Sequence, residues 1–155
     1  MRMNDLVNMV TPKNITFFDE QGDLNKETVL DTISQLLYKN GYVKESYRQA
    51  IKDREAVFPT GLNTTTYGIA IPHTDSKHVN EATIAVGILK HPVTFQEMGA
   101  EEVEVPVRLV FMLAIKEPDK QLETLQSVIS LIENEEKMNA LVHSENESDV
   151  IQLLN

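Results

Sequence analysis

The chain has 155 residues, of which 41% are hydrophobic and 25% charged, and it contains no cysteine. These values fit one globular domain, residues 1–155, and the lack of cysteine excludes disulfides, thiolate metal sites and cysteine nucleophiles. The formal net charge of −10 disfavours binding to nucleic acid or to an anionic membrane surface. It would steer a basic protein partner favourably, and the alternative is that the acidic surface only maintains solubility.

The sequence shows no sign of a leader peptide or of a membrane span. Residues 1–14 contain no continuous apolar core of signal-peptide length. No apolar run in the chain approaches the roughly 20 residues that a membrane-spanning helix needs. We therefore expect a cytoplasmic protein that does not insert into the membrane.

Two helices are predicted after a short β-prone run at residues 14–18. The first begins at Asn25, a favourable N-cap residue, and ends at Gly41. Between these bounds, apolar residues recur at helical spacing: Val29, Leu30, Ile33, Leu36 and Leu37. The second helix fits residues 45–56 and is broken by Pro59.

The centre of the chain changes to short apolar runs rich in Ile and Val, which predict buried strands. These runs cover residues 68–71, 83–89 and 108–115. We expect Pro92 to end the second run, so that residues 93–95 form at most a short edge strand.

Helical spacing returns in the last third of the chain. One helix is predicted to bury Leu122, Leu125, Val128, Ile129 and Ile132. Two shorter helices fit residues 135–142 and 148–154. The predicted order is a strand, two helices, several strands and then helices. This order predicts a single-domain α/β fold, with a mixed β-sheet that has helices on both faces.

His73 has the most unusual position of the four histidines, because it follows a buried apolar run and Pro72 directly. At such a rigid strand end, one ring nitrogen can face outward while the other donates to a backbone carbonyl and fixes the tautomer. A histidine that accepts a phosphoryl group needs this neutral ring and exposed lone pair. On the residues alone, a turn histidine without a chemical role remains the alternative.

The stretch from His73 to His78 also allows a metal site. It holds two imidazoles and the carboxylate of Asp75 within six positions, a composition that zinc accepts. Lys77 lies among these residues, however, and no further cluster of strong ligands is evident. The sequence therefore favours a site without metal or cofactor.

Four stretches of the chain together match a known pattern. Residues 67–74 read Tyr-Gly-Ile-Ala-Ile-Pro-His-Thr, and residues 54–61 contain an Arg-Glu pair and a Phe-Pro-Thr-Gly tetrad. Residues 111–115 and 121–125 add an apolar strand and the start of a helix. The combination resembles the enzyme IIA domains of the mannitol/fructose class in the sugar phosphotransferase systems of bacteria. This resemblance covers nearly the whole chain and implies the mixed-sheet fold of that class. It also implies a phosphotransferase that carries the phosphoryl group on a histidine.

Position 121 departs from the usual pattern of this class. Mannitol and fructose members usually carry a second histidine where this chain has Gln121. A glutamine there, together with the Phe-Pro-Thr-Gly tetrad, is more similar to the galactitol-type IIA proteins, and it puts a two-histidine mechanism in doubt. The amide of Gln121 can still donate a hydrogen bond.

The resemblance implies two successive phosphoryl transfers. The phosphocarrier protein HPr donates to His73, on Nε2, and His73 passes the group to a IIB component that usually accepts on cysteine and serves the membrane IIC component. Arg54 matches an arginine near the site of these proteins, and its guanidinium is expected to hold two phosphoryl oxygens. Gln121 and Thr74 are further candidates for phosphoryl contacts.

Two other functions stay open on the sequence. Relatives of this fold act as regulators whose binding partner changes with the phosphorylation state of the histidine, and such a protein has no sugar substrate. A metal-dependent hydrolase would require bound zinc. The tetrad and Gln121 favour the transport role, for a sugar or sugar alcohol such as galactitol.

Overall fold

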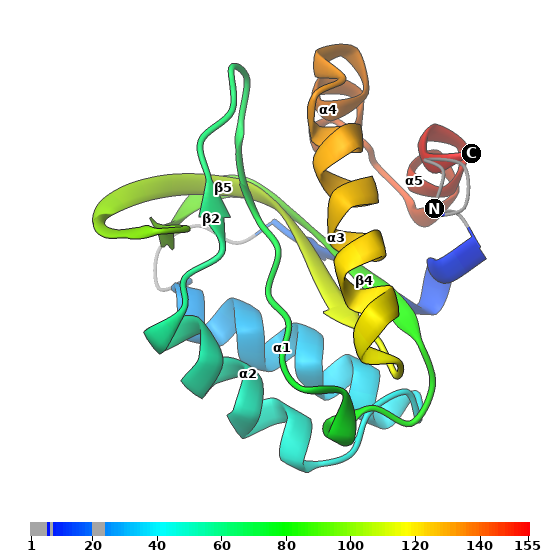
Figure 1. Cartoon of the computed structure of the whole chain (residues 1–155). Coiled ribbons are helices and arrows are strands. Elements are labelled where there is room, and N and C mark those ends of the chain that lie inside the picture. The colour runs from blue at the N-terminus through cyan, green and yellow to red at the C-terminus, as the bar shows by residue number, and fades with distance from the viewer. Residues whose placement is uncertain (1–5, 7, 20–23) are drawn as a thin grey trace.

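The computed structural model describes residues 6, 8–19 and 24–155 of the chain (Figure 1). Most of the first seven residues, on which part of the leader-peptide expectation rests, lie outside the described residues. The strands are β1 (Ile15–Phe18), β2 (Gly61–Leu62), β3 (Gly68–Ala70), β4 (Thr83–Glu97) and β5 (Ala100–Ala114). The helices are α1 (Lys26–Lys39), α2 (Ser46–Val57), α3 (Pro118–Ile132), α4 (Glu135–Val142) and α5 (Glu147–Leu154), with short 3-10 turns η2 (Pro12–Asn14) and η3 (Ser76–His78).

The five strands form one mixed sheet in the order β1-β4-β2-β3-β5, and β4 also pairs with β5 as a long antiparallel hairpin. β1 runs parallel to β4, and β3 runs parallel to β5. β2 pairs antiparallel with β3 and meets the end of β4 at Glu97. The pairing of β3 with β5 matters for function, because it fixes the position of the residues that follow β3.

Side chains of the sheet alternate between two cores, one on each face. Along β5, Leu109 and Phe111 belong to one core, whereas Val110 and Met112 belong to the other. Apolar residues of α3, α4 and α5 complete the first core, and those of α1 and α2 complete the second (Figure 1). The predicted mixed sheet with helices on both faces is therefore confirmed.

The helices lie close to their predicted bounds. The side chain of Asn25 accepts a hydrogen bond from the Thr28 N–H at 2.9 Å and so caps α1. Gly41 follows the end of α1 with φ +84°, in the left-handed region where glycine is favoured. In the described part of the chain, no helix has both the length and the apolar character that crossing a membrane requires.

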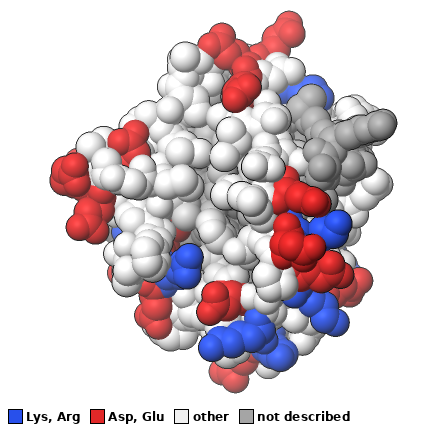
Figure 2. Space-filling view, viewed as in Figure 1, with Lys and Arg blue, Asp and Glu red and all other residues white. Residues whose placement is uncertain are grey.

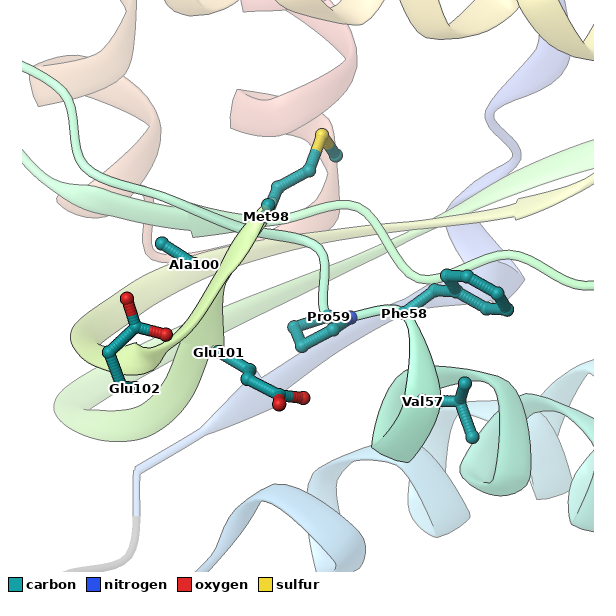
Figure 3. Close-up of a pocket in the computed structure, with 8 residues that line it drawn as sticks. Val57, Phe58, Pro59, Met98, Ala100, Glu101 and Glu102 are labelled. Atoms are coloured by element: carbon teal, nitrogen blue, oxygen red, sulfur yellow. The ribbon is translucent and has the colours of Figure 1, made fainter.

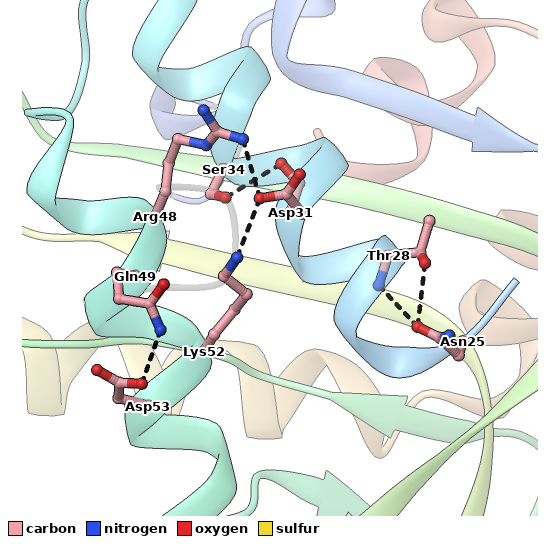
Figure 4. Close-up of polar contacts among 8 residues, drawn as sticks. All are labelled: Asn25, Thr28, Asp31, Ser34, Arg48, Gln49, Lys52 and Asp53. Atoms are coloured by element: carbon pink, nitrogen blue, oxygen red, sulfur yellow. Dashed lines mark hydrogen bonds and ion pairs between the residues drawn. The ribbon is translucent and has the colours of Figure 1, made fainter.

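Asp31 of α1 joins the two helices on its face of the sheet (Figure 4). Its Oδ1 lies 2.9 Å from Nη2 of Arg48 and 3.3 Å from Nζ of Lys52, both on α2. Such partly exposed ion pairs add little stability each. They do align α2 against α1, and α2 carries Arg54 near its C-terminal end.

The predicted end of the second strand at Pro92 is wrong, because β4 continues to Glu97. The register between β4 and β5 shifts there, so that residues 89–92 lie opposite Arg108 alone. Extra residues in a bulge make no ladder hydrogen bonds, which is why proline is tolerated at this place. Nε of Arg108 donates to the Leu89 carbonyl oxygen at 2.6 Å within this bulge. Residues 93–95 therefore continue β4 and do not form an edge strand of their own.

Two other strand predictions are incomplete. β5 begins at Ala100, eight residues before the predicted run. Its early part alternates valines with polar residues and buries Val105 and Val107, and a search for continuous apolar runs passes over such an alternation. β2 is not predicted, since a two-residue strand leaves no periodicity to detect.

The buried face of α3 differs from the predicted one. Leu122 and Ile129 are 60% and 36% exposed. Val128 and Ile132 are buried as predicted, and α3 also buries Thr124, Ser127 and Leu131. The hydroxyl of Thr124 donates to the Lys120 carbonyl oxygen at 2.8 Å, so burial leaves it a partner. A search for apolar spacing passes over Thr124 and Ser127 because they are polar, and it therefore places the face of the helix partly on the exposed Leu122 and Ile129.

Candidate functional site

His73 lies just beyond the end of β3, and its backbone is held by β5. The Leu113 N–H of β5 donates to the Pro72 carbonyl oxygen at 2.9 Å, and His73 pairs with Leu113 in a parallel bridge. From α2, the hydroxyl of the buried Tyr47 donates to the Leu113 carbonyl oxygen at 2.8 Å. The turn that carries the histidine is thus anchored to β5 at Leu113, and Tyr47 ties the same residue of β5 to α2.

The ring of His73 is oriented by its own backbone. Nδ1 lies 2.8 Å from the Ile71 carbonyl oxygen. A carbonyl can only accept, so Nδ1 carries the proton and Nε2 keeps its lone pair. Burial lowers the pKa of His73, the hydrogen bond to Ile71 acts against this shift, and the positive charge of Arg54 lowers the pKa further. Near pH 7 the ring is neutral, with one free lone pair.

Arg54 lies in the last turn of α2, close enough to His73 for its charge to act on the ring. Its guanidinium carbon is 4.6 Å from the centre of the Phe58 ring, a stacking distance that restrains the guanidinium. Arg54 and Thr74 line the same shallow hollow of about 300 Å³ beside the histidine turn. The fold therefore brings a cation and a hydroxyl to the immediate surroundings of His73.

The other two candidate residues differ in their placement. Thr74 is 7% exposed, so it is a buried residue of the turn and not an ordinary surface threonine. Gln121 is partly exposed near the start of α3. In the part of the chain that the structure describes, no hydrogen bond joins Gln121 to His73, Arg54 or Thr74.

His78 has a separate environment from His73. It lies in η3, and its Nδ1 is 2.8 Å from the Ser46 hydroxyl oxygen. Among residues 6, 8–19 and 24–155, no group of three or more histidine, cysteine, aspartate or glutamate side chains is placed to hold a metal ion. A zinc site at His73 and His78 thus has no further ligand in those ranges.

A buried acid near the site, Glu55, lies outside the sequence prediction. Glu55 is 2% exposed, and its two carboxyl oxygens accept hydrogen bonds from the backbone N–H and the hydroxyl of Thr60, each at 2.8 Å. Burial raises the pKa of Glu55 to about 7, and the hydrogen bonds from Thr60 act against this shift. A signal was available in the spacing: Glu55 follows Tyr47 and Ile51 at four-residue intervals on the buried stripe of α2, where an apolar residue is expected.

The Phe-Pro-Thr-Gly tetrad is locked against β4 by its glycine. A Cβ at Gly61 would lie only 2.5 Å from the Gln96 carbonyl oxygen, so no other residue type fits without a shift of the backbone. The Met98 N–H also donates to the Gly61 carbonyl oxygen at 2.7 Å. This close approach fixes the position of Thr60, the neighbour that contacts Glu55.

Apolar side chains are exposed around the same hollow. Val57 and Phe58 line it and are 62% and 58% exposed. Together with Met98 they also border a second hollow of about 400 Å³ (Figure 3). Figure 2 shows that the acidic side chains of this view lie mostly toward its edge, while its middle is largely uncharged. Exposed apolar groups of this kind next to a reactive side chain are typical of a surface that binds another protein.

Comparisons with known proteins identify the family of the chain. Residues 9–155 match the model of the family "Phosphoenolpyruvate-dependent sugar phosphotransferase system, EIIA 2". The chain is 28% identical over 137 residues to the galactitol-specific EIIA component of Escherichia coli strain K12, which covers 88% of this chain and 87% of that protein. It is also 33% identical over 134 residues to the fructose-specific EIIABC component of Bacillus subtilis strain 168, covering 84% of this chain but 20% of that longer protein.

A solved structure shows the same fold. It is the complex of enzyme IIA with phosphorylated enzyme IIB of the mannitol system of Escherichia coli, which matches with a TM-score of 0.76 and 25% identity. The match covers 94% of this chain and 96% of the matched one. The predicted family and fold are thus confirmed. The chain belongs to the EIIA 2 family of the phosphoenolpyruvate-dependent sugar phosphotransferase system and is a phosphotransferase component.

Proposed function

We propose that this protein accepts a phosphoryl group on Nε2 of His73 from the phosphohistidine of HPr and passes it to a IIB component. The observation that carries the proposal is the hydrogen bond from Nδ1 to the Ile71 carbonyl oxygen, which leaves Nε2 unprotonated. A neutral imidazole held in this way is a nucleophile at neutral pH. Membership of the family and the solved complex of a IIA with a phosphorylated IIB support the identity of the two partners.

The chemistry uses one lone pair and moves no proton. In the first transfer, Nε2 attacks phosphorus and the N–P bond of phospho-HPr breaks, so that the donor imidazole leaves with the electron pair. His73 then carries the phosphoryl group on Nε2 and a proton on Nδ1, so its ring is cationic and a good leaving group. In the second transfer, a cysteine thiolate of IIB attacks phosphorus, and His73 returns to its neutral state with the bond to Ile71 intact.

Arg54 is proposed to stabilise the negative charge of the phosphoryl group in the transition state of the transfer. Phosphoryl transfer depends on positioning and on compensation of charge at the equatorial oxygens. The guanidinium of Arg54 can hold two of these oxygens, and its effect on the pKa of His73 supports the required proximity. Thr74 lines the same hollow and is a second candidate contact, whereas Gln121, on α3, does not line that hollow and is the weaker candidate.

The sugar is proposed to be galactitol or a similar sugar alcohol. Two features support this: the 28% identity to a galactitol-specific EIIA over most of both chains, and the glutamine at position 121. The proposed partners HPr and IIB also favour a cytoplasmic location. Transfer from the phosphorylated protein to a purified galactitol-type IIB tests this role, and a regulator without a transport role would not support that transfer.

Intact mass measurement tests the phosphoryl acceptor. The purified protein is incubated with phosphoenolpyruvate, enzyme I and HPr, and its mass is recorded at neutral or alkaline pH, because N–P bonds hydrolyse in acid. We expect one added phosphoryl group on the wild type and on His78→Ala, and none on His73→Ala. Uptake by His73→Ala contradicts the acceptor, and no uptake by the wild type contradicts the function.

A further inference from the structure

A continuous run of hydrogen bonds connects the buried Glu55 to the ring of His73. The Thr60 hydroxyl donates to Oε1 of Glu55 at 2.8 Å and accepts from the Ile71 N–H at 3.1 Å. The carbonyl oxygen of Ile71 then accepts from Nδ1 of His73 at 2.8 Å. Glu55 and Thr60 are only 2% and 3% exposed, so water does not compete for these bonds.

The direction of each bond in this run is fixed. A backbone N–H can only donate, so the Thr60 hydroxyl oxygen receives the Ile71 N–H and its own hydrogen points to Glu55. The Thr60 N–H donates to the other carboxyl oxygen at 2.8 Å. Glu55 must therefore accept at both oxygens, which suits a carboxylate. A side-chain amide of the same shape has one acceptor and one donor group, so it cannot satisfy both bonds.

Ile71 is the residue on which these bonds converge. Its N–H donates to the Thr60 hydroxyl at 3.1 Å and, at the longer distance of 3.4 Å, to the Thr60 carbonyl oxygen, and its own carbonyl oxygen holds His73. Because Pro72 follows directly, the backbone between Ile71 and His73 has few conformations. A displacement of Ile71 therefore moves the carbonyl oxygen that fixes the tautomer and the orientation of the imidazole.

We propose that Glu55 is a positioning residue for His73, acting through Thr60 and the Ile71 backbone to hold Nε2 toward the incoming phosphoryl group. Glu55 does not touch His73 or the reacting atoms. The inference rests on the proposed function for the role of Nε2, but the tautomer that Glu55 maintains exists before any phosphoryl group arrives. The competing explanation is that Glu55 only anchors the Phe-Pro-Thr-Gly tetrad for stability.

The test compares variants along the run of bonds with matched controls. Glu55→Gln removes one acceptor, Thr60→Val removes the hydroxyl, and Thr60→Ser keeps it. Glu136→Gln is the control for loss of an acid, because Glu136 is exposed at the start of α4. Ring ¹⁵N chemical shifts of His73 at about pH 8 report the tautomer, rapid-quench measurements report kcat and KM for transfer from phospho-HPr, and urea midpoints report stability.

We expect Thr60→Ser and Glu136→Gln to keep the single Nδ1–H tautomer and the transfer rate of the wild type. Glu55→Gln and Thr60→Val should show both tautomers and a kcat about 10-fold lower, the lower end of what loss of an orienting partner costs at comparable sites, with KM unchanged. Loss of stability alone would not change the tautomer of the folded protein.

Folded Glu55→Gln and Thr60→Val with the wild-type tautomer and kcat would overturn the inference. Should Glu55→Gln fail to fold, the comparison of Thr60→Val with Thr60→Ser decides alone. Failure of the proposed function is a separate outcome: the wild type would take up no phosphoryl group on His73, while the ¹⁵N shifts of the unphosphorylated variants would still decide whether Glu55 sets the tautomer.

Discussion

The guanidinium of Arg54 stacks on the ring of Phe58, with 4.6 Å between the guanidinium carbon and the ring centre, and both side chains line the hollow beside the His73 turn. In the proposed function, Arg54 offers charge to phosphoryl oxygens, and Phe58 offers exposed apolar area to a protein partner. Stacking couples the two roles, because the ring that a partner would contact also restrains the guanidinium.

Arg54→Ala should slow phosphoryl transfer from phospho-HPr by about 10²–10³-fold, by analogy with removal of one oxyanion donor. The free energy of unfolding should change by only about 0.5 kcal/mol, because the side chain is not part of the core. Arg54→Lys keeps the charge without the two-pronged donor and should be partly impaired. Rapid-quench kinetics and urea midpoints give both quantities. A wild-type rate in Arg54→Ala would show that Arg54 is an ordinary surface charge of α2 without a role in transfer.

Phe58→Ala should raise the KM for phospho-HPr about 10-fold, which corresponds to about 1.4 kcal/mol of lost docking free energy. Stability should hardly change, because 58% of the Phe58 side chain is exposed. The control is Tyr38→Ala, which removes a 43% exposed aromatic side chain near the C-terminal end of α1. Equal KM values for the two variants would show that the apolar surface at Phe58 does not bind HPr.

The pKa of His73 should lie below its ordinary value of 6.5, mainly because burial disfavours the imidazolium. Arg54→Ala should raise this pKa, since it removes a positive neighbour. The rate of phosphoryl uptake should fall as the pH drops through the pKa, where the lone pair of Nε2 is lost to a proton. An NMR titration of the ring measures the pKa directly, and a value above 6.5 in the wild type would contradict the prediction.

Glu55 should make the folded state less stable as the pH rises. Burial raises its pKa from 4.5 to about 7, so the folded protein binds this proton more tightly than the unfolded chain does. The stabilising contribution is complete below pH 4.5 and is lost as the pH rises to about 7. Relative to Glu55→Gln, the wild type should lose about 3 kcal/mol of unfolding free energy over this interval. Urea titrations of both proteins across the interval provide the measurement; a difference between them that stays constant with pH would rule the effect out.

The helices could be predicted from the sequence because their signals are local. The cap at Asn25 and the glycine at position 41 act on neighbouring residues only, and both are found where expected. The path of β4 through Pro92 could not be predicted in this way. Whether a proline is tolerated in a strand depends on whether its position needs an N–H, and here the bulge opposite Arg108 decides that.

The same distinction applies to the site. The turn at His73 is visible in sequence because Pro72 and the apolar run precede it directly. The contacts of Glu55 are not visible, because Thr60 and Ile71 meet only when β2 pairs with β3. The exposure of Leu122 was equally hidden, since α3 turns its polar Thr124 toward the core. Residues whose roles depend on distant partners therefore need the folded structure.

The pairing of His73 with Leu113 has a consequence for the synthesis of the protein. Forty residues separate the two, and Leu113 supplies both the N–H that binds the Pro72 carbonyl oxygen and the carbonyl oxygen that Tyr47 binds. A nascent chain on the ribosome contains the histidine long before β5 emerges, and until then the Pro72 carbonyl oxygen lacks its partner on β5. Fragments from interrupted translation that end before Leu113 thus carry the proposed acceptor residue without its contact to β5, and they should divert few phosphoryl groups from finished molecules.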